Sequence, residues 1–183
     1  MKPIHLLSAT VLLLAACKES PQASTPASGE ASSADKVVLE SVLNATPEGE
    51  AKAIKEVKAS AKPGDEVTVT GRIMGHVKPF VEGRAAFILA DPSLITACSD
   101  NPGDECGTPW DACCDSPEDK KKAIATIQIV NADGRVLKQG LEGANGLANL
   151  ATVTVSGQVA AGSAGDLLIV NASAIGVAPS REP

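Results

Sequence analysis

Five segments of the chain carry the apolar and polar patterns of β-strands. Residues 66–73 alternate Val67, Val69 and Ile73 on one face with polar residues on the other, which is typical of a half-buried strand. Two later segments are apolar at most positions, as in strands covered on both faces. Turn-forming residues separate the segments. The sequence therefore predicts strands at residues 66–73, 85–91, 123–130, 152–159 and 166–177.

Two of the predicted strands are near copies of each other, because VTVTGRI at residues 67–73 and VTVSGQV at residues 153–159 carry glycine at the same offset. A glycine inside a strand marks a bend or a close approach of another backbone, and closed sheets need such positions. Five strands of this kind, with a long connector at residues 141–150, are similar to the OB fold. This resemblance implies a mainly β protein with a five-stranded Greek-key barrel at residues 65–178, whose first and fourth strands pair. A small open β-sandwich is the competing architecture.

The segment before the barrel, residues 36–64, contains a predicted helix. Thr46 and Pro47 have the chemistry of an N-cap and a first helical position, and lysines gather toward the other end. We expect a helix at residues 47–61 whose narrow apolar side packs lightly on the barrel. The shorter segment at residues 36–43 fits a helix or a strand, since periodicity cannot decide over so few residues.

The start of the chain is typical of an exported lipoprotein. Lys2 precedes an apolar run at residues 4–16, which is too short to span a bilayer and matches the apolar region of a signal peptide. The run ends in Leu-Ala-Ala before Cys17, which resembles the lipidation site of a bacterial lipoprotein precursor. An ordinary secretory signal with a chance cysteine is the alternative.

This resemblance implies that the folded domain is exported and lies outside the cytoplasm, anchored through lipid on Cys17 to the bacterial cell envelope membrane. Residues 1–16 are then the signal peptide. Residues 17–35 have the composition of a disordered tether that follows the lipidated cysteine, and residues 179–183 that of a loose tail.

Charge and aromatic content restrict the expected partners. The net charge of −6 at pH 7 repels polyanions, so no nucleic-acid partner is expected. Trp110 and Asp111 are the candidate partner contacts. Trp110 either forms an exposed platform or, as the shortage of other aromatic residues favours, folds against the barrel end as a plug.

Four of the five cysteines lie in one stretch, CSDNPGDECGTPWDACC at residues 98–114, between the second and third predicted strands. Export places them where disulfides form and persist. A bond between the adjacent Cys113 and Cys114 would close a strained ring. Two pairings remain open: Cys98–Cys113 with Cys106–Cys114, or Cys98–Cys114 with Cys106–Cys113. Either pairing predicts two disulfides that contribute about 3 kcal/mol each.

The same residues, Cys98, Cys106, Cys113 and Cys114, could together with His76 form a metal site. Structural zinc sites usually take cysteines two residues apart, and this loop has no such pair. The thiols of adjacent cysteines also tend to diverge. The compartment and the spacing therefore favour disulfides over a metal, and no cofactor is expected. His76 is the only histidine after the signal peptide, so no Ser-His-Asp or Cys-His catalytic set can be assembled and no enzyme activity is expected.

The chain also resembles a group of uncharacterised exported bacterial lipoproteins with an OB-fold-like domain and a PWDxCC loop. The shared motifs are Gly71-Arg72, KPFVEGR at residues 78–84, DPS at residues 91–93, Cys98, Cys106 and PWDACC at residues 109–114. The resemblance implies the fold and the location and carries no activity. We expect a non-catalytic, disulfide-stapled binding or scaffolding module with an envelope protein or a glycan as partner. A metal-handling lipoprotein and a binder of single-stranded nucleic acid or oligosaccharide are the alternatives.

Overall fold

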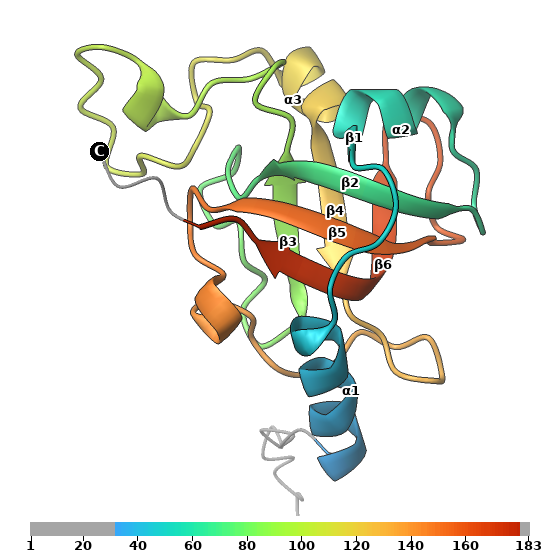
Figure 1. Cartoon of the computed structure of the whole chain (residues 1–183). Helices are drawn as coiled ribbons and strands as arrows, with labels where there is room; N and C mark the ends of the chain where they lie inside the picture. The colour runs from blue at the N-terminus through green and yellow to red at the C-terminus, as the bar shows by residue number, and fades with distance from the viewer. Residues whose placement is uncertain (1–31, 180–183) are drawn as a thin grey trace, which may run out of the picture.

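The computed structural model describes residues 32–179, which form a β-barrel with short helices packed around it (Figure 1). The five predicted strands are confirmed as β2 to β6, with ends that differ from the predicted ones by no more than two residues. Within these residues, no helix has the length and apolar character needed to cross a membrane. In chain order the elements are α1 (Ser33–Asn44), β1 (Lys52–Ala53), α2 (Ile54–Ser60), β2 (Glu66–Arg72), β3 (Ala86–Ala90), the 3-10 turn η1 (Cys98–Asp100), α3 (Pro117–Ala123), β4 (Ile124–Gln128), the 3-10 turn η2 (Ala144–Gly146), β5 (Thr152–Val159) and β6 (Leu168–Val177).

Strands β2 to β6 close into a barrel. Antiparallel pairing joins β2 to β3, β3 to β4, β6 to β5 and β5 to β2, whereas β4 and β6 pair in parallel. The β2–β5 pair extends from Glu66 opposite Gln158 to Arg72 opposite Thr152. Because this pair joins the fourth barrel strand to the first, the sheet is closed and is not an open sandwich.

The two glycines of the repeated strand motif lie where another backbone comes very close. A Cβ on Gly157 would lie 2.2 Å from the carbonyl oxygen of Asn171, and a Cβ on Gly71 would lie 2.6 Å from that of Ala90. The β5–β6 register shifts between Ser156 and Gly157, so this approach sits at a bulge. The predicted close backbone approach at both glycines is confirmed.

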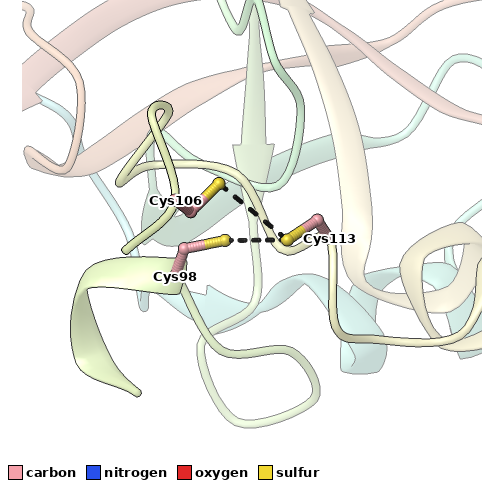
Figure 2. A group of neighbouring side chains, drawn as sticks. All are labelled: Cys98, Cys106 and Cys113. Carbon is pink, nitrogen blue, oxygen red and sulfur yellow. Dashed lines mark hydrogen bonds between the residues drawn. The ribbon is translucent and has the colours of Figure 1, made fainter. Parts of the chain in front are cut away.

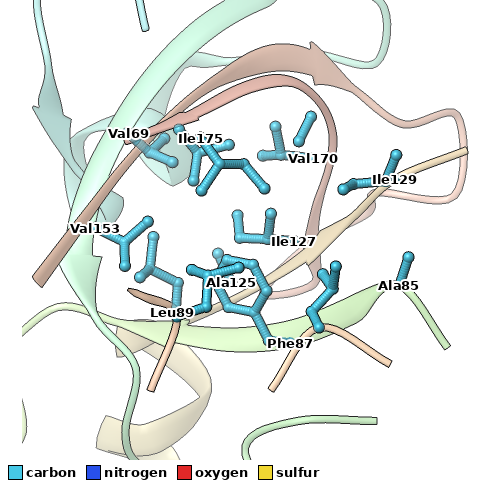
Figure 3. Close-up of a cluster of buried hydrophobic side chains, with 14 of the residues drawn as sticks. Val69, Ala85, Phe87, Leu89, Ala125, Ile127, Ile129, Val153, Val170 and Ile175 are labelled. Atoms are coloured by element: carbon cyan, nitrogen blue, oxygen red, sulfur yellow. The ribbon is translucent and has the colours of Figure 1, made fainter. Parts of the chain in front are cut away.

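Apolar side chains from all five strands fill the barrel interior (Figure 3). Val69, Phe87, Ile127, Val153 and Val170 are fully buried and point into the same space. Phe87 is the largest of the fully buried side chains, and its neighbours are mostly aliphatic. Burial of each such side chain stabilises the fold by about 1.5–3 kcal/mol, which makes the barrel a rigid support for the loops at its ends.

The segment at residues 36–43, which periodicity could not assign, is part of α1. Ser32 caps this helix, because its hydroxyl accepts a hydrogen bond of 3.1 Å from the backbone N–H of Asp35. Leu39 and Val42 bury its apolar side. The helix begins at Ser33, so the end of the predicted tether is helical, whereas the predicted signal peptide and Cys17 lie outside the described residues.

The predicted helix at residues 47–61 is too long: only its second half is helical, as α2. The backbone of Glu48 is held by side chains of the barrel, since its N–H donates to Ser156 Oγ at 2.9 Å and its carbonyl accepts from the Thr68 hydroxyl. These bonds tie the stretch before α2 to the barrel, and residues 45–51 are not helical. Ile54 and Val57 on α2 are nearly fully buried, so the helix packs tightly and the expectation of light packing is wrong.

A helix that the sequence analysis did not predict, α3, leads into β4. The Ser116 hydroxyl accepts a hydrogen bond of 3.1 Å from the N–H of Asp119, and Pro117 occupies the first turn. Lys58 of α2 donates from Nζ to the carbonyl oxygens of Lys121 and Asp166. This lysine therefore joins α2, the last turn of α3 and the loop before β6.

Candidate functional site

The cysteine loop, residues 98–114, connects β3 to α3 and rests on a small apolar cluster of its own. Two stretches of the loop pair through their backbones, because Cys98 N–H donates to Asp111 O at 2.7 Å and Ser99 N–H donates to Pro109 O at 2.9 Å. These bonds bring the first and last parts of the loop together. The cluster beneath them consists of Met74, Ala90, Ile95, Ala97, Ala112 and Ala123.

Acidic side chains hold the loop in place. Asp111 is 6% exposed, and its carboxylate accepts from Ala112 N–H at 2.8 Å and lies 3.8 Å from Lys120 Nζ. Asp100 forms an ion pair with Arg72 of β2. The Asp111 carboxylate is therefore engaged within the fold, and of the two candidate partner contacts only Trp110 is partly exposed.

Three of the four loop thiols converge on one point (Figure 2). Cys113 Sγ lies 3.2 Å from Cys98 Sγ and 4.0 Å from Cys106 Sγ. The Sγ atoms of Cys98, Cys106 and Cys113 all lie within 4.8 Å of one another. We call Cys98, Cys106 and Cys113 the inner set.

The predicted disulfides are not formed in this structure, in which all four cysteines of the described residues are free. The shortest sulfur separation, 3.2 Å between Cys98 and Cys113, exceeds the S–S bond length of about 2.05 Å. Either predicted pairing also needs Cys114 to reach Cys98 or Cys106. Instead, the Cys114 sulfur lies 3.9 Å from Asp104 Oδ2 and 4.0 Å from Cys113 Sγ.

These contacts define a second group, Asp104, Cys113 and Cys114, which we call the outer set. Its ligand atoms also lie within 4.8 Å of one another; Cys113 and Cys114 are exposed, and Asp104 is partly exposed. Asp104 Oδ1 accepts a hydrogen bond of 2.8 Å from Cys106 N–H, which leaves Oδ2 directed to Cys114. The four cysteines thus form two sets that share Cys113 and do not form one four-thiol site.

The thiols of the inner set differ in acidity. Cys98 is 1% exposed, and burial raises the pKa of its thiol to about 12. The Thr108 hydroxyl, 3.3 Å from Cys106 Sγ, and the Thr108 backbone N–H lower the pKa of Cys106. For Cys113, the hydrogen bond with Cys98 lowers the pKa, but the Cys114 thiol and burial raise it more. Cys106 is therefore the inner-set thiol that becomes a thiolate most readily.

His76, the fifth candidate metal ligand, belongs to neither set among residues 32–179. Its exposed ring accepts a hydrogen bond of 3.0 Å from Lys78 N–H at Nδ1, so it stabilises a turn. Asp104 is not among the predicted ligands of a thiol metal site. The signal available for it was its position two residues before Cys106, where an aspartate can accept from the following backbone.

Trp110 lies between the two states predicted for it. Its Nε1 donates to Val77 O at 3.0 Å and its carbonyl accepts from Gly75 N–H at 2.8 Å, so the residue joins the cysteine loop to the loop after β2. The ring is partly exposed and lines a cavity of about 510 Å³ with Val77, Phe80 and Leu141.

The arrangement supports two kinds of chemistry. Free thiols that converge from separate parts of a loop can coordinate one soft cation, and a close pair of thiols can be oxidised to a disulfide.

Comparison with known protein families, curated proteins and solved structures finds no match for this chain.

Proposed function

We propose that this protein is an exported, lipid-anchored and non-catalytic module of the bacterial envelope whose cysteine loop binds a thiophilic cation. The convergence of Cys98, Cys106 and Cys113, each within 4.8 Å of the others, is the observation that carries the proposal. Thiolates are soft ligands that select Zn(II) and Cu(I) among biological cations. We therefore take these two ions as the cargo class.

The sulfur separations suit a common ion. A metal–sulfur bond of about 2.3 Å places the sulfurs about 3.8 Å apart in a tetrahedral site and about 4.0 Å apart in a trigonal one. The Cys106–Cys113 separation of 4.0 Å matches these values, and the Cys98–Cys113 separation of 3.2 Å needs a small outward movement. Three protein ligands leave a fourth position open, which is typical of sites that exchange their ligand or ion.

The barrel supplies the support for this loop. We infer an OB-fold-like Greek-key barrel, because β2 pairs antiparallel with β5 and β4 pairs in parallel with β6. On this reading the cysteine loop joins the second and third barrel strands. The acidic net charge of −6 favours cations over nucleic acid as the cargo of the loop.

Export and anchoring rest on the first residues of the chain. The apolar run at residues 4–16 and Cys17 after two alanines support a lipidated N-terminus, which would hold the barrel outside the cytoplasm. A cation bound by thiolates would protect them from oxidation in that compartment. No reaction is assigned, since His76 lies in neither set of candidate ligands within residues 32–179.

Metal titration of the reduced protein tests the proposal. Cys17→Ser removes the one thiol outside the described residues, and Zn(II) and Cu(I) are then titrated separately without oxygen. We expect one ion per chain and loss of binding in Cys106→Ser. Glu105→Gln, which changes a neighbouring charge and no thiol, is the control and should bind normally. The proposal would be overturned if neither Zn(II) nor Cu(I) binds stoichiometrically.

A disulfide clasp is the second candidate, and the 3.2 Å separation between Cys98 and Cys113 sulfurs favours it. A bond between these two would close the loop over the apolar cluster beneath it. Alkylation of the exported protein without reductant, followed by intact mass, distinguishes the candidates. Alkylation of Cys106 and Cys114 alone, in protein that carries no metal, supports the clasp, whereas metal removal followed by alkylation of the inner set supports the cation site.

A further inference from the structure

We propose that the outer set, Asp104, Cys113 and Cys114, is a loading site that receives the cation from solvent and passes it to the inner set. This inference rests on the proposed function, since it assigns a route to the cation bound there. The observation that carries it is the shared ligand: Cys113 belongs to both groups of converging ligand atoms.

The outer set is more exposed to solvent than the inner set. Both sets share the exposed Cys113; the outer set adds the exposed Cys114 and the partly exposed Asp104, whereas the inner set adds the buried Cys98 and the partly buried Cys106. A hydrated ion can therefore reach the outer set first. Cys113 Sγ lies 4.0 Å from Cys114 Sγ on one side and 3.2 Å from Cys98 Sγ on the other, so an ion held by Cys113 moves only a short way between sets.

The Asp104 carboxylate is placed for this role. Its Oδ1 is fixed by the 2.8 Å hydrogen bond from Cys106 N–H, and its Oδ2 lies 3.9 Å from Cys114 Sγ. Of the acidic residues nearby, Asp100 is paired with Arg72, and Asp115 Oδ2 accepts from the N–H of Thr96. Asp104 is thus the acid whose remaining oxygen faces a thiol.

The ligand types give the transfer a direction. The outer set offers one oxygen and two sulfurs, and the inner set offers three sulfurs. Zn(II) accepts both kinds of ligand, and a soft cation gains from the exchange of oxygen for sulfur. A carboxylate also attracts the cation through its charge, which increases the rate of association.

The transfer is a ligand exchange without change of oxidation state. The bonds from the cation to Asp104 oxygen and Cys114 sulfur break, and bonds to Cys98 and Cys106 sulfur form. The Cys113 bond persists throughout. The Cys98 and Cys106 thiols each release a proton, and the Cys114 thiolate takes one up, so one proton is released to solvent per transfer.

Stopped-flow uptake of Zn(II) by the reduced Cys17→Ser protein tests the route, with equilibrium affinity measured separately against a fluorescent chelator. Asp104→Asn keeps the oxygen that accepts from Cys106 N–H and removes the charge. We expect Asp104→Asn and Cys114→Ser to slow uptake by about tenfold with the equilibrium affinity unchanged. Cys106→Ser should lose affinity by about 100-fold or more. Glu105→Gln, the matched control for loop charge, should load at the rate of the parent protein.

Each outcome separates the loading site from the proposed function. Normal uptake rates in both Asp104→Asn and Cys114→Ser would overturn the loading site and leave the inner-set cation site standing. An affinity loss in Cys114→Ser equal to that in Cys106→Ser would also overturn it, because all four cysteines would then belong to one site. Failure of the parent protein to bind Zn(II) or Cu(I) would overturn the proposed function itself.

Discussion

Replacement of Gly157 by alanine tests the close approach of β5 to β6 at the bulge. The added Cβ would lie 2.2 Å from Asn171 O and 2.9 Å from Ala172 Cα, both of which are backbone atoms of β6. The two strands must therefore separate by about 1 Å to restore van der Waals contact. Overpacking costs about 1–3 kcal/mol, and a weakened hydrogen bond between the strands costs about 1 kcal/mol more. We expect Gly157→Ala to lower the free energy of unfolding by about 3 kcal/mol.

Urea denaturation of the purified protein measures this loss, and thermal unfolding should show a Tm lower by about 10 °C. Gly140→Ala is the matched control, since a Cβ there meets no atom within 4 Å. The control should be neutral or slightly stabilising, because alanine reduces the entropy of the unfolded chain. An equal effect of both substitutions, or a stability of Gly157→Ala within about 0.5 kcal/mol of the parent protein, would refute the close approach of the two backbones at Gly157.

Three further substitutions test the surroundings of the site. Burial raises the pKa of Asp91, but hydrogen bonds from Ser93 and a backbone N–H lower it more, so the net shift is downward. The ionised carboxylate therefore stabilises the fold above the unfolded pKa of about 3.9, and this contribution is lost as pH falls through the lower folded value. Asp91→Asn should unfold more easily at pH 7 and lose less stability on acidification, as followed by urea denaturation at each pH. Lys58→Met keeps the apolar stem but loses two donations to backbone carbonyls, so we expect a loss of about 1–2 kcal/mol and faster amide exchange in α3. Trp110→Phe removes the donation to Val77 O and should cost about 1 kcal/mol in the same denaturation assay, with unchanged Zn(II) affinity.

The barrel could be predicted because each strand carries its own local sequence signals. Side-chain alternation and bounding turns placed all five strands, and Gly71 and Gly157 marked the close approaches. The extent of α2 could not be predicted, since the helix is shortened by the bond from Glu48 N–H to Ser156, which is 108 positions away. Helix α3 had a readable start in Ser116, but its seven residues are too few to show a helical period, and no helix was predicted there.

The sequence predicted which cysteines make up the candidate site but did not predict how their side chains are grouped. The four cysteines do lie close together in one loop after β3, as their spacing in the chain suggested. Their division into two sets depends on the backbone bond from Cys98 to Asp111 and on the contact between Cys114 and Asp104. Such contacts follow from the path of a loop without regular secondary structure, which no periodicity in the sequence describes.

X-ray absorption spectroscopy at the zinc edge of the loaded Cys17→Ser protein tests the central claim most directly. If Cys98, Cys106 and Cys113 hold the cation, the spectrum should require three sulfur neighbours at about 2.3 Å and one lighter ligand. In Cys106→Ser, any zinc that remains should have fewer sulfur neighbours. A first shell of oxygen and nitrogen alone in the parent protein would contradict the account.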